Sequence, residues 1–239
     1  MKLMIEEELI LSAVVANNRM NRERNATGVN SYEKDLDFHP VQYLQDYIER
    51  FGQVKWLDLC CGEGRALLQC ALNLDRNNLQ HRATLKGIDL IAGFQPIPSN
   101  LTCLQLQVGS VVDWTADDRY DFITCVHGLH YVGDKLLIVQ SACRALTAQG
   151  VFMAHLDLQN IKISNQLDNK WIIRKFRDSG LEYNPRKRIL FCKGPQELDF
   201  GLRYQGACDK AGPNYTRQDA VASYYIQRRN DGKIMVLEM

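Results

Sequence analysis

The segment from residue 54 to residue 74 constrains the fold more than any other part of the chain. A near-continuous apolar run at 54–60 (VKWLDLC) precedes a turn with Gly62 and Gly64, and apolar residues then recur at helical spacing in RALLQCALNL (65–74). Apolar runs of this kind are typical of parallel strands covered on both faces. A helix that starts after such a turn directs free N–H groups at any ligand held there. The segment predicts a strand, a turn and a helix, in which the turn either binds nothing or cradles a small molecule.

Further strands and helices continue this alternation along the middle of the chain. A strongly apolar helix is expected at 134–146, whereas no clear helix joins the third and fourth strands. Strands separated by helices build a doubly wound, mainly parallel sheet with helices on both faces. We therefore predict an α/β fold, with later strands at 84–90, 101–109, 120–127 and 150–158.

The two ends of the chain differ from this middle. Residues 1–53 are expected to be helical, including a short helix at 40–51, and a basic helix is expected within 165–181, ended by Gly180. DKAGPNYTR (209–217) is a hairpin-type turn, and strand-like runs occupy 187–192, 198–206, 220–228 and 234–239. With no repeat or obvious linker, we predict a single domain made of a helical N-terminal lid (1–53), a core (54–158) and a lid helix with C-terminal strands (159–239).

Composition and charge argue against several classes of protein. The net charge of the 239 residues is +1, which leaves no electrostatic footprint for a nucleic acid. No run approaches the roughly 20 apolar residues of a membrane span, and glutamates at 6–8 interrupt what would be the apolar part of a signal peptide. The eight cysteines include no C-x-x-C pair and lie mostly in apolar runs, as buried thiols do in a reducing compartment. We expect a cytoplasmic monomer or homodimer without a nucleic-acid or membrane partner.

The acids around the turn indicate which ligand it suits. Leu67 stands where a dinucleotide-binding turn has its third glycine, which argues against a bound pyrophosphate. Asp58, at the end of the first strand, would repel a pyrophosphate and suits a ligand that carries an ammonium group. Asp89, which closes the second strand, is placed to bind the two hydroxyls of a ribose, although it can instead cap a helix.

The ordered motifs LDLCCGEG (57–64), GIDL (87–90), VGSVVDW (108–114) and the run from the fourth strand through the fifth resemble those of class I S-adenosylmethionine-dependent methyltransferases of the Rossmann-like, small-molecule type. The resemblance covers roughly residues 54–158. It implies a seven-stranded sheet with an antiparallel last strand, which we expect the C-terminal hairpin to supply. It also implies S-adenosyl-L-methionine as the cofactor.

The resemblance implies a cofactor site formed by Asp58, Cys60, Gly62, Gly64, Asp89, Leu90, Ser110, Val111 and His127. Two positions depart from the usual motifs. Cys60 replaces the first glycine of the turn, so a positive φ there is costly. Ser110 replaces an aspartate that often faces the adenine amino group; its hydroxyl can still accept that bond, so we expect weaker anchoring of the adenine.

Histidines near the strand ends are the candidates for catalysis. His127 and His130 flank the end of the fourth strand and His155 lies late in the fifth, so the three can converge where ligands bind. An imidazole with a pKa near neutrality suits a general base that removes a proton from the methyl acceptor. We predict this role for His127 or His130, with structural packing as the alternative, and we expect His155 to pack structurally. No carboxylate stands at a diagnostic spacing for a three-histidine metal site, so we expect no metal.

The methyl acceptor is expected to be a small molecule, including a natural product or a small peptide. We predict that residues 17–32 order over the cofactor and that Tyr32, Tyr131, Trp171 and Arg174 contact the acceptor. Two alternatives stay open. One is a binding module that has kept the cradle without the chemistry; the other is an RNA methyltransferase, which the near-neutral charge disfavours.

Overall fold

The computed structural model describes residues 2–16, 23–164 and 169–228. The predicted helix at 40–51 is confirmed as α4 (Pro40–Phe51), which has a proline at its first position and Gly52 at its C-terminal end. The run predicted as a strand at 234–239 lies outside the described residues. The helices of the N-terminal part are α1 (Glu6–Leu9), α2 (Ala13–Ala16), α3 (Tyr32–Leu36) and α4.

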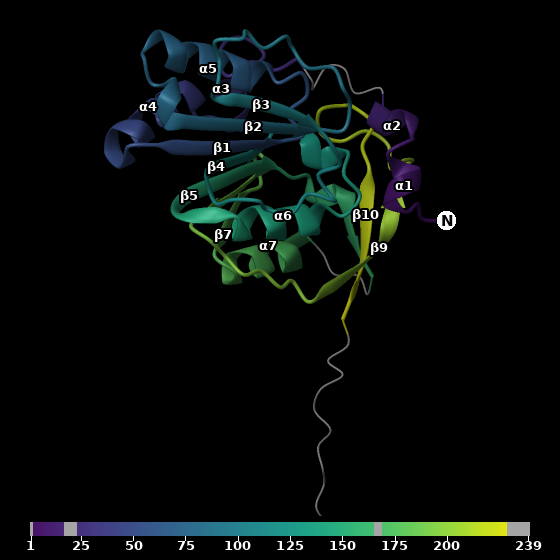
Figure 1. Ribbon diagram of the computed structural model, residues 1–239. Coiled ribbons are helices and arrows are strands. Elements are labelled where there is room, and N and C mark those ends of the chain that lie inside the picture. Colours follow the sequence, from purple (N-terminus) through teal and green to yellow (C-terminus); the bar gives the residue numbers. More distant parts are fainter. Residues whose placement is uncertain (1, 17–22, 165–168, 229–239) are drawn as a thin grey trace, which may run out of the picture.

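A seven-stranded sheet forms the centre of the molecule, with strand order β3-β2-β1-β4-β5-β8-β7 (Figure 1). Neighbouring strands from β3 to β5 are parallel, whereas β8 pairs antiparallel with both β5 and β7. The predicted fold, a mainly parallel sheet with an antiparallel C-terminal strand, is confirmed. The strands are β1 (Val54–Leu59), β2 (Ala83–Asp89), β3 (Leu104–Val108), β4 (Tyr120–Cys125), β5 (Leu146–His155), β7 (Leu181–Asn184) and β8 (Ile189–Lys193).

The source of the antiparallel strand differs from the expectation. It is β8, formed by the strand-like run predicted at 187–192, and not the hairpin further along the chain. The hairpin turn joins β9 (Leu202–Cys208) and β10 (Ala222–Gln227), which form a separate three-stranded sheet with β6 (Ile161–Ile163). Figure 1 shows β9 and β10 beside α1 at one end of the main sheet. The N-terminal segment joins this sheet through a bridge between Met4 and Ala207.

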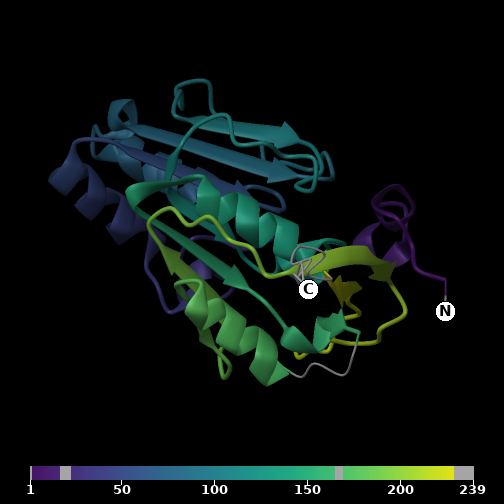
Figure 2. The same ribbon diagram turned by 90° about the horizontal axis from the view of Figure 1, so that it is seen from below.

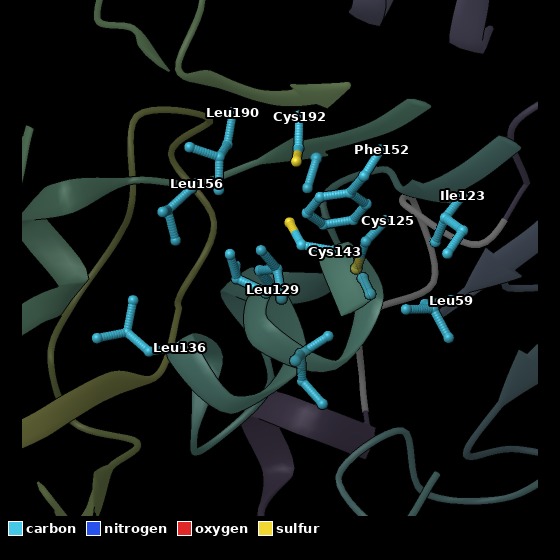
Figure 3. Packing of buried hydrophobic residues seen from close by; sticks show 14 of the residues in the cluster. Leu59, Ile123, Cys125, Leu129, Leu136, Cys143, Phe152, Leu156, Leu190 and Cys192 are labelled. Carbon is cyan, nitrogen blue, oxygen red and sulfur yellow. The ribbon is translucent and has the colours of Figure 1, made fainter. Parts of the chain in front are cut away.

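Helices cover both faces of the main sheet. The face that carries α4 also carries α5 (Arg65–Arg76), and the opposite face carries α6 (Lys135–Arg144) and α7 (Asn169–Asp178), both visible in Figure 2. The core is therefore divided into two layers by the sheet. Figure 3 shows part of one layer, in which Phe152, Leu190 and Cys192 of the sheet face Cys143 of α6 and Leu129.

The order of the strands decides where a ligand can bind. β1 lies between β2 and β4. The strands that follow β1 in the chain, β2 and β3, lie on one side of it, and β4 and β5 lie on the other side. Ligands of open α/β sheets bind outside the carboxyl ends of the strands at such a switch point. As predicted, no helix forms between β3 and β4; the two strands are joined by a loop at 109–119.

Candidate functional site

A cavity lies at the carboxyl ends of β1, β2, β3 and β4. The empty space inside it, counted with its open mouth, is about 700 Å³, which is in the range of small-molecule sites. The N-terminal segment forms one of its walls with Glu6, Ile10 and Val15. The rest of the wall comes from the residues that follow the four strands: Cys60, Gly62, Asp89, Leu90, Ile91, Ser110, Val111, Val126, His127, Gly128, Tyr131 and Val132.

Most residues predicted to bind the cofactor line this one cavity. They are Cys60, Gly62, Asp89, Leu90, Ser110, Val111 and His127. Asp58 and Gly64 lie outside its lining. Among the residues predicted to contact the acceptor, Tyr131 lines the cavity, whereas Trp171 and Arg174 belong to α7 and do not line it.

Asp89 and Gly62, at the ends of β2 and β1, form what we call the floor of the cavity. The side chain of Asp89 is held firmly there. Its side chain accepts hydrogen bonds from the backbone N–H of Gly62, at 2.8 Å, and of Ile91, at 3.1 Å. The residue is 9% exposed, so the carboxylate is largely shielded while still facing the cavity. Because the Gly62 N–H belongs to the turn after β1 and Asp89 ends β2, this bond locks the two strand ends together.

Asp58 occupies a buried position in β1. Its side chain accepts hydrogen bonds from the Tyr32 hydroxyl at 2.7 Å and the Thr124 hydroxyl at 2.6 Å. Burial raises its pKa to about 7, against the opposing effect of the two hydroxyl donors. Tyr32 is likewise buried, so its hydroxyl fastens α3 to the sheet. The two predicted site residues therefore contact each other below the cavity.

The backbone of the turn is left-handed at three positions. Cys60, Gly62 and Gly64 have φ values of 58°, 62° and 73°. Cys60 adopts this conformation although it has a side chain, so the backbone at this position has the unfavourable conformational energy that the sequence analysis expected. Gly64 has a second reason to be glycine: a Cβ on it would lie 2.6 Å from a methyl group of Leu106. A Cβ on Gly128 would lie 2.3 Å from the Cβ of Cys60, so Gly128 leaves room for that cysteine.

The three predicted histidines lie together beside the cavity. The rings of His127 and His155 are stacked, with centroids 4.1 Å apart and planes 6° apart, and the ring of His130 lies 5.6 Å from that of His127. All three side chains are buried. His127 directly follows β4 and has a φ of 61°, an uncommon conformation for a residue with a side chain.

Two residues that the sequence did not point to contact His127. Its Nε2 lies 3.3 Å from Oδ2 of Asp35 in α3, within ion-pair distance although not aligned as a hydrogen bond. Its Nδ1 lies 3.4 Å from the hydroxyl of Tyr215, in the segment between β9 and β10. No short-range pattern links residues 35, 127 and 215, so only the folded chain reveals this contact.

Burial and charge set the protonation of the histidine cluster. Burial lowers the pKa of His127, whereas the neighbouring Asp35 carboxylate raises it. Burial raises the pKa of Asp35, but the opposing effects of His127 and Arg24 are together larger and bring this pKa down to about 2. Burial and the neighbouring His127 lower the pKa of His155 to about 3 and that of His130 well below its ordinary value. Among the residues that the structure describes, His127 is the imidazole of the three that has a carboxylate within ion-pair distance of its ring nitrogen.

The described residues contain no cluster of histidine, cysteine and acidic side chains arranged to hold a metal ion. Likewise, no helix in the described parts of the chain is long and apolar enough to span a membrane.

The model of one protein family, described as a methyltransferase domain, matches residues 29–186. No curated protein sequence matches the chain. The match begins just before α3 and ends after β7, so it includes Asp35, the turn after β1 and all three histidines.

Several solved structures are similar to this chain over part of its length. One is CalS10, an amino pentose methyltransferase from Micromonospora echinaspora, with 16% identity and a TM-score of 0.38 over 52% of this chain and 50% of that one. Another is YjhP from E. coli, with 15% identity and a TM-score of 0.39 over 57% and 53% of the two chains. A third is the plantazolicin methyltransferase BpumL, with 17% identity and a TM-score of 0.41 over 58% and 50%. The chain thus spans about half the length of each.

Proposed function

Because this chain belongs to the class I S-adenosylmethionine-dependent methyltransferases, we propose that it transfers a methyl group to a small-molecule nucleophile bound in the cavity at the strand ends. One observation carries the proposal. The same cavity has a fixed carboxylate, Asp89, on its floor and an imidazole with a carboxylate partner, His127, in its wall. The Asp89 carboxylate can bind ribose hydroxyls, and the His127 imidazole can accept a proton.

The residues of the cavity fit S-adenosylmethionine. Asp89 presents a shielded carboxylate that can accept hydrogen bonds from two ribose hydroxyls. The left-handed turn at Gly62 brings backbone, without a side chain, to the floor of the cavity. Apolar side chains that can enclose a planar base come from the ends of β2 and β3 and from the loop after β4, among them Leu90, Ile91, Val111 and Val132. When bound, the cofactor supplies a methyl group on a positively charged sulfur, which is already a strong electrophile.

The protein then has two tasks, positioning and proton transfer. The rigid floor fixes the cofactor, and the wall formed by α1, α2 and the loop after β4 excludes water from the reacting atoms. An acceptor of high pKa must also lose a proton as it is methylated. We assign this proton to His127, whose imidazolium form is stabilised by Asp35. His130 does not line the cavity and has no carboxylate beside its ring within the described residues, so His127 is favoured over it.

Calorimetry with S-adenosylhomocysteine, the demethylated product, tests cofactor binding directly. Asp89→Ala is expected to weaken binding by about 10- to 150-fold, because charge-assisted bonds to the ribose are worth about 1.5–3 kcal/mol. Asp46→Ala, on the exposed face of α4, is the matched control and should bind as the parent does. Asp89→Asn keeps the size of the side chain, and circular dichroism confirms that each variant is folded. Absence of binding by the parent protein contradicts the proposal.

Turnover is tested with a panel of small phenols, amines, thiols and carboxylic acids, by following the release of S-adenosylhomocysteine from S-adenosylmethionine. Release that depends on one class of acceptor supports the proposed reaction and names the acceptor atom. Tight cofactor binding with no release across the panel favours the alternative, a binding module without chemistry.

A further inference from the structure

Glu6 of α1 contributes a second carboxylate to the cavity. Of the described residues that line the cavity, only Glu6 and Asp89 have an acidic side chain, and none is a lysine or an arginine. Asp89 lies on the floor and already accepts two backbone N–H bonds. Glu7 and Glu8, which follow Glu6 in α1, are exposed and do not line the cavity. Glu6 is thus the acidic side chain that the described part of the chain places in the wall.

The carboxylate of Glu6 lies against the loop after β4. A Cβ built on Gly133 would lie 2.1 Å from Oε2 of Glu6 and 2.6 Å from the hydroxyl of Tyr204, so the glycine leaves the space that the carboxylate occupies. The segment that carries Glu6 is anchored to β9, because Met4 and Ala207 exchange two backbone hydrogen bonds, of 2.8 and 2.9 Å. The position of this carboxylate is therefore set by the fold on both sides.

No described residue donates a hydrogen bond of ordinary geometry to Oε2 of Glu6, although this oxygen is buried. Burial raises the pKa of Glu6, whereas the backbone of Gly133 and the charge of Lys135 lower it. Lys135 directs its three N–H donors elsewhere, at 2.7, 2.9 and 3.0 Å, to the carbonyls of Val132 and Val221 and the hydroxyl of Ser223. A buried carboxylate oxygen without a donor is costly, and a bound molecule that offers an N–H group relieves this cost.

The surroundings of Glu6 indicate which part of a bound cofactor would offer that N–H group. The proposed function encloses the planar base between apolar side chains that include Val111 and Val132. Gly133, which contacts Glu6, directly follows Val132. Asp113, whose charge raises the pKa of Glu6, follows Val111 in the loop after β3. Glu6 therefore lies at the edge of the space that suits the base.

The end of β3 has no charged acceptor of its own in the wall of the cavity. Ser110 stands there in place of the aspartate that often faces the adenine amino group. Its hydroxyl accepts a hydrogen bond from the backbone N–H of Val112, at 3.2 Å, within its own loop. An ionised carboxylate accepts an N–H hydrogen bond more strongly than a neutral hydroxyl does. Glu6 can thus supply the stronger acceptor that this position lacks.

We propose that Glu6 recognises the adenine of the bound cofactor by accepting a hydrogen bond from its amino group, so that the N-terminal segment supplies the acid that the end of β3 lacks. The inference rests on the proposed function of the cavity. Hypoxanthine carries an oxygen where adenine carries the amino group, and this oxygen has no hydrogen to donate to a carboxylate. Glu6 is therefore a residue that makes the cavity select an adenine nucleoside.

Calorimetry with S-adenosylhomocysteine and with S-inosylhomocysteine, in which an oxygen replaces the amino group of the base, tests this assignment without an acceptor. The parent should bind the adenine compound at least about tenfold more tightly. Glu6→Gln should remove most of this preference, because its amide can donate to the oxygen as well as accept from the amino group. Glu7→Gln, which changes an exposed acid of the same helix, is the matched control and should keep the preference.

Gly133→Ala displaces the carboxylate while Glu6 itself is unchanged, because the added Cβ would overlap Oε2. The φ of Gly133 lies outside the left-handed region, so alanine can adopt the backbone there. This variant should also lose most of the preference for the adenine compound. Circular dichroism confirms that each variant is folded.

Two results would overturn the assignment while leaving the proposed function intact. A preference that Glu6→Gln leaves unchanged shows that the carboxylate does not meet the base. An equal loss of affinity for both compounds in Glu6→Gln shows that the carboxylate holds the ammonium group that the two compounds share. Failure of the parent protein to bind either compound contradicts the proposed function itself, and the role of Glu6 with it.

Discussion

The two sides of the cavity are built in different ways. The floor is formed by consecutive strand ends, where the Asp89 carboxylate accepts two backbone N–H bonds of 2.8 and 3.1 Å. The histidine side is assembled from α3, the ends of β4 and β5 and the segment before β10, and its contacts to His127 are longer, at 3.3 and 3.4 Å. The bonds at Asp89 hold its carboxylate to the backbone of two neighbouring turns, whereas the contacts of His127 join side chains from separate elements. The floor is thus suited to holding a cofactor and the histidine side to chemistry.

The largest expected effect lies beneath the floor, at Asp58. Its pKa is raised by burial to about 7, so between pH 4 and 7 the folded state holds a proton that the unfolded state releases. Stability should therefore fall as the pH rises through this window, by about 1.4 kcal/mol per unit and about 4 kcal/mol in all. Urea unfolding at several pH values should show this slope in the parent protein and a flatter one in Asp58→Asn.

A matched control for Asp58 is Asp121→Asn. Asp121 is also buried and accepts from a tyrosine hydroxyl, that of Tyr47, but it lies at the start of β4, away from the cavity. A slope as flat in this variant as in Asp58→Asn would mean that the slope does not report on Asp58 in particular. Equal slopes in Asp58→Asn and the parent show that Asp58 is ionised in the folded protein and that the floor does not rest on a neutral acid.

The second effect separates the two histidines that follow β4. His127→Gln should lower turnover on the reactive acceptor by about 100-fold, since it removes the group that takes the proton, with little change in affinity for S-adenosylhomocysteine. His130→Gln should act mainly on the fold, because the side chain is completely buried, and should lower the melting temperature. If both variants methylate the acceptor at the parent rate, the histidine side only positions the substrate and the assignment of a base is wrong.

A third, smaller effect tests whether the glycine turn serves the fold or the ligand. Gly64→Ala should destabilise the protein by about 1–3 kcal/mol, because the new Cβ meets Leu106 and the φ of 73° disfavours a side chain. Gly201→Ala is the control, with a φ of 67° and nothing within 4 Å of the added Cβ, and should cost less. Unfolding in urea measures both. Equal costs would mean that only the backbone conformation matters at Gly64.

The smallest effect concerns the predicted lid at 17–32, of which 17–22 lie outside the described residues. Backbone amides at 23–32 should exchange more slowly with solvent when S-adenosylhomocysteine is added, because this stretch leads into α3 and carries Asp35 toward His127. Hydrogen exchange followed by mass spectrometry measures the difference. Identical exchange with and without the ligand rules out a lid that responds to the cofactor.

The fold was predictable because its signals are local. The apolar run of β1, the glycines after it and the spacing of α5 lie within one short stretch, and they identify the sheet and its ligand edge. The antiparallel strand was assigned to the wrong segment, since a hairpin signal says that two strands pair but not which sheet they join. β9 and β10 form a separate sheet with β6, and β8 lies between β5 and β7 in the main sheet.

Part of the lining of the cavity was predictable for the same reason, whereas the roles of its residues stay predictions. Asp89 and Gly62 follow motifs that can be read along the chain, and seven of the nine expected cofactor residues line the cavity: Cys60, Gly62, Asp89, Leu90, Ser110, Val111 and His127. Asp35 and Tyr215 were missed, because their meeting with His127 depends on how α3 and the C-terminal sheet pack against the strand ends. Such a contact depends on tertiary packing and leaves no periodic pattern in the sequence.

The bridge between Met4 and Ala207 also determines when the cavity can form during synthesis. The wall that contains Glu6 is attached to β9, and the backbone N–H of Val221 donates to the carbonyl of His130, so both sides of the cavity depend on residues made late. A chain emerging from the ribosome can pair β1 to β5 before β9 is made, and until then α1 lacks the strand on which it docks. The cavity therefore needs residues up to Val221 to be complete, and a truncation before β9 should leave a folded sheet whose cavity lacks the wall that contains Glu6.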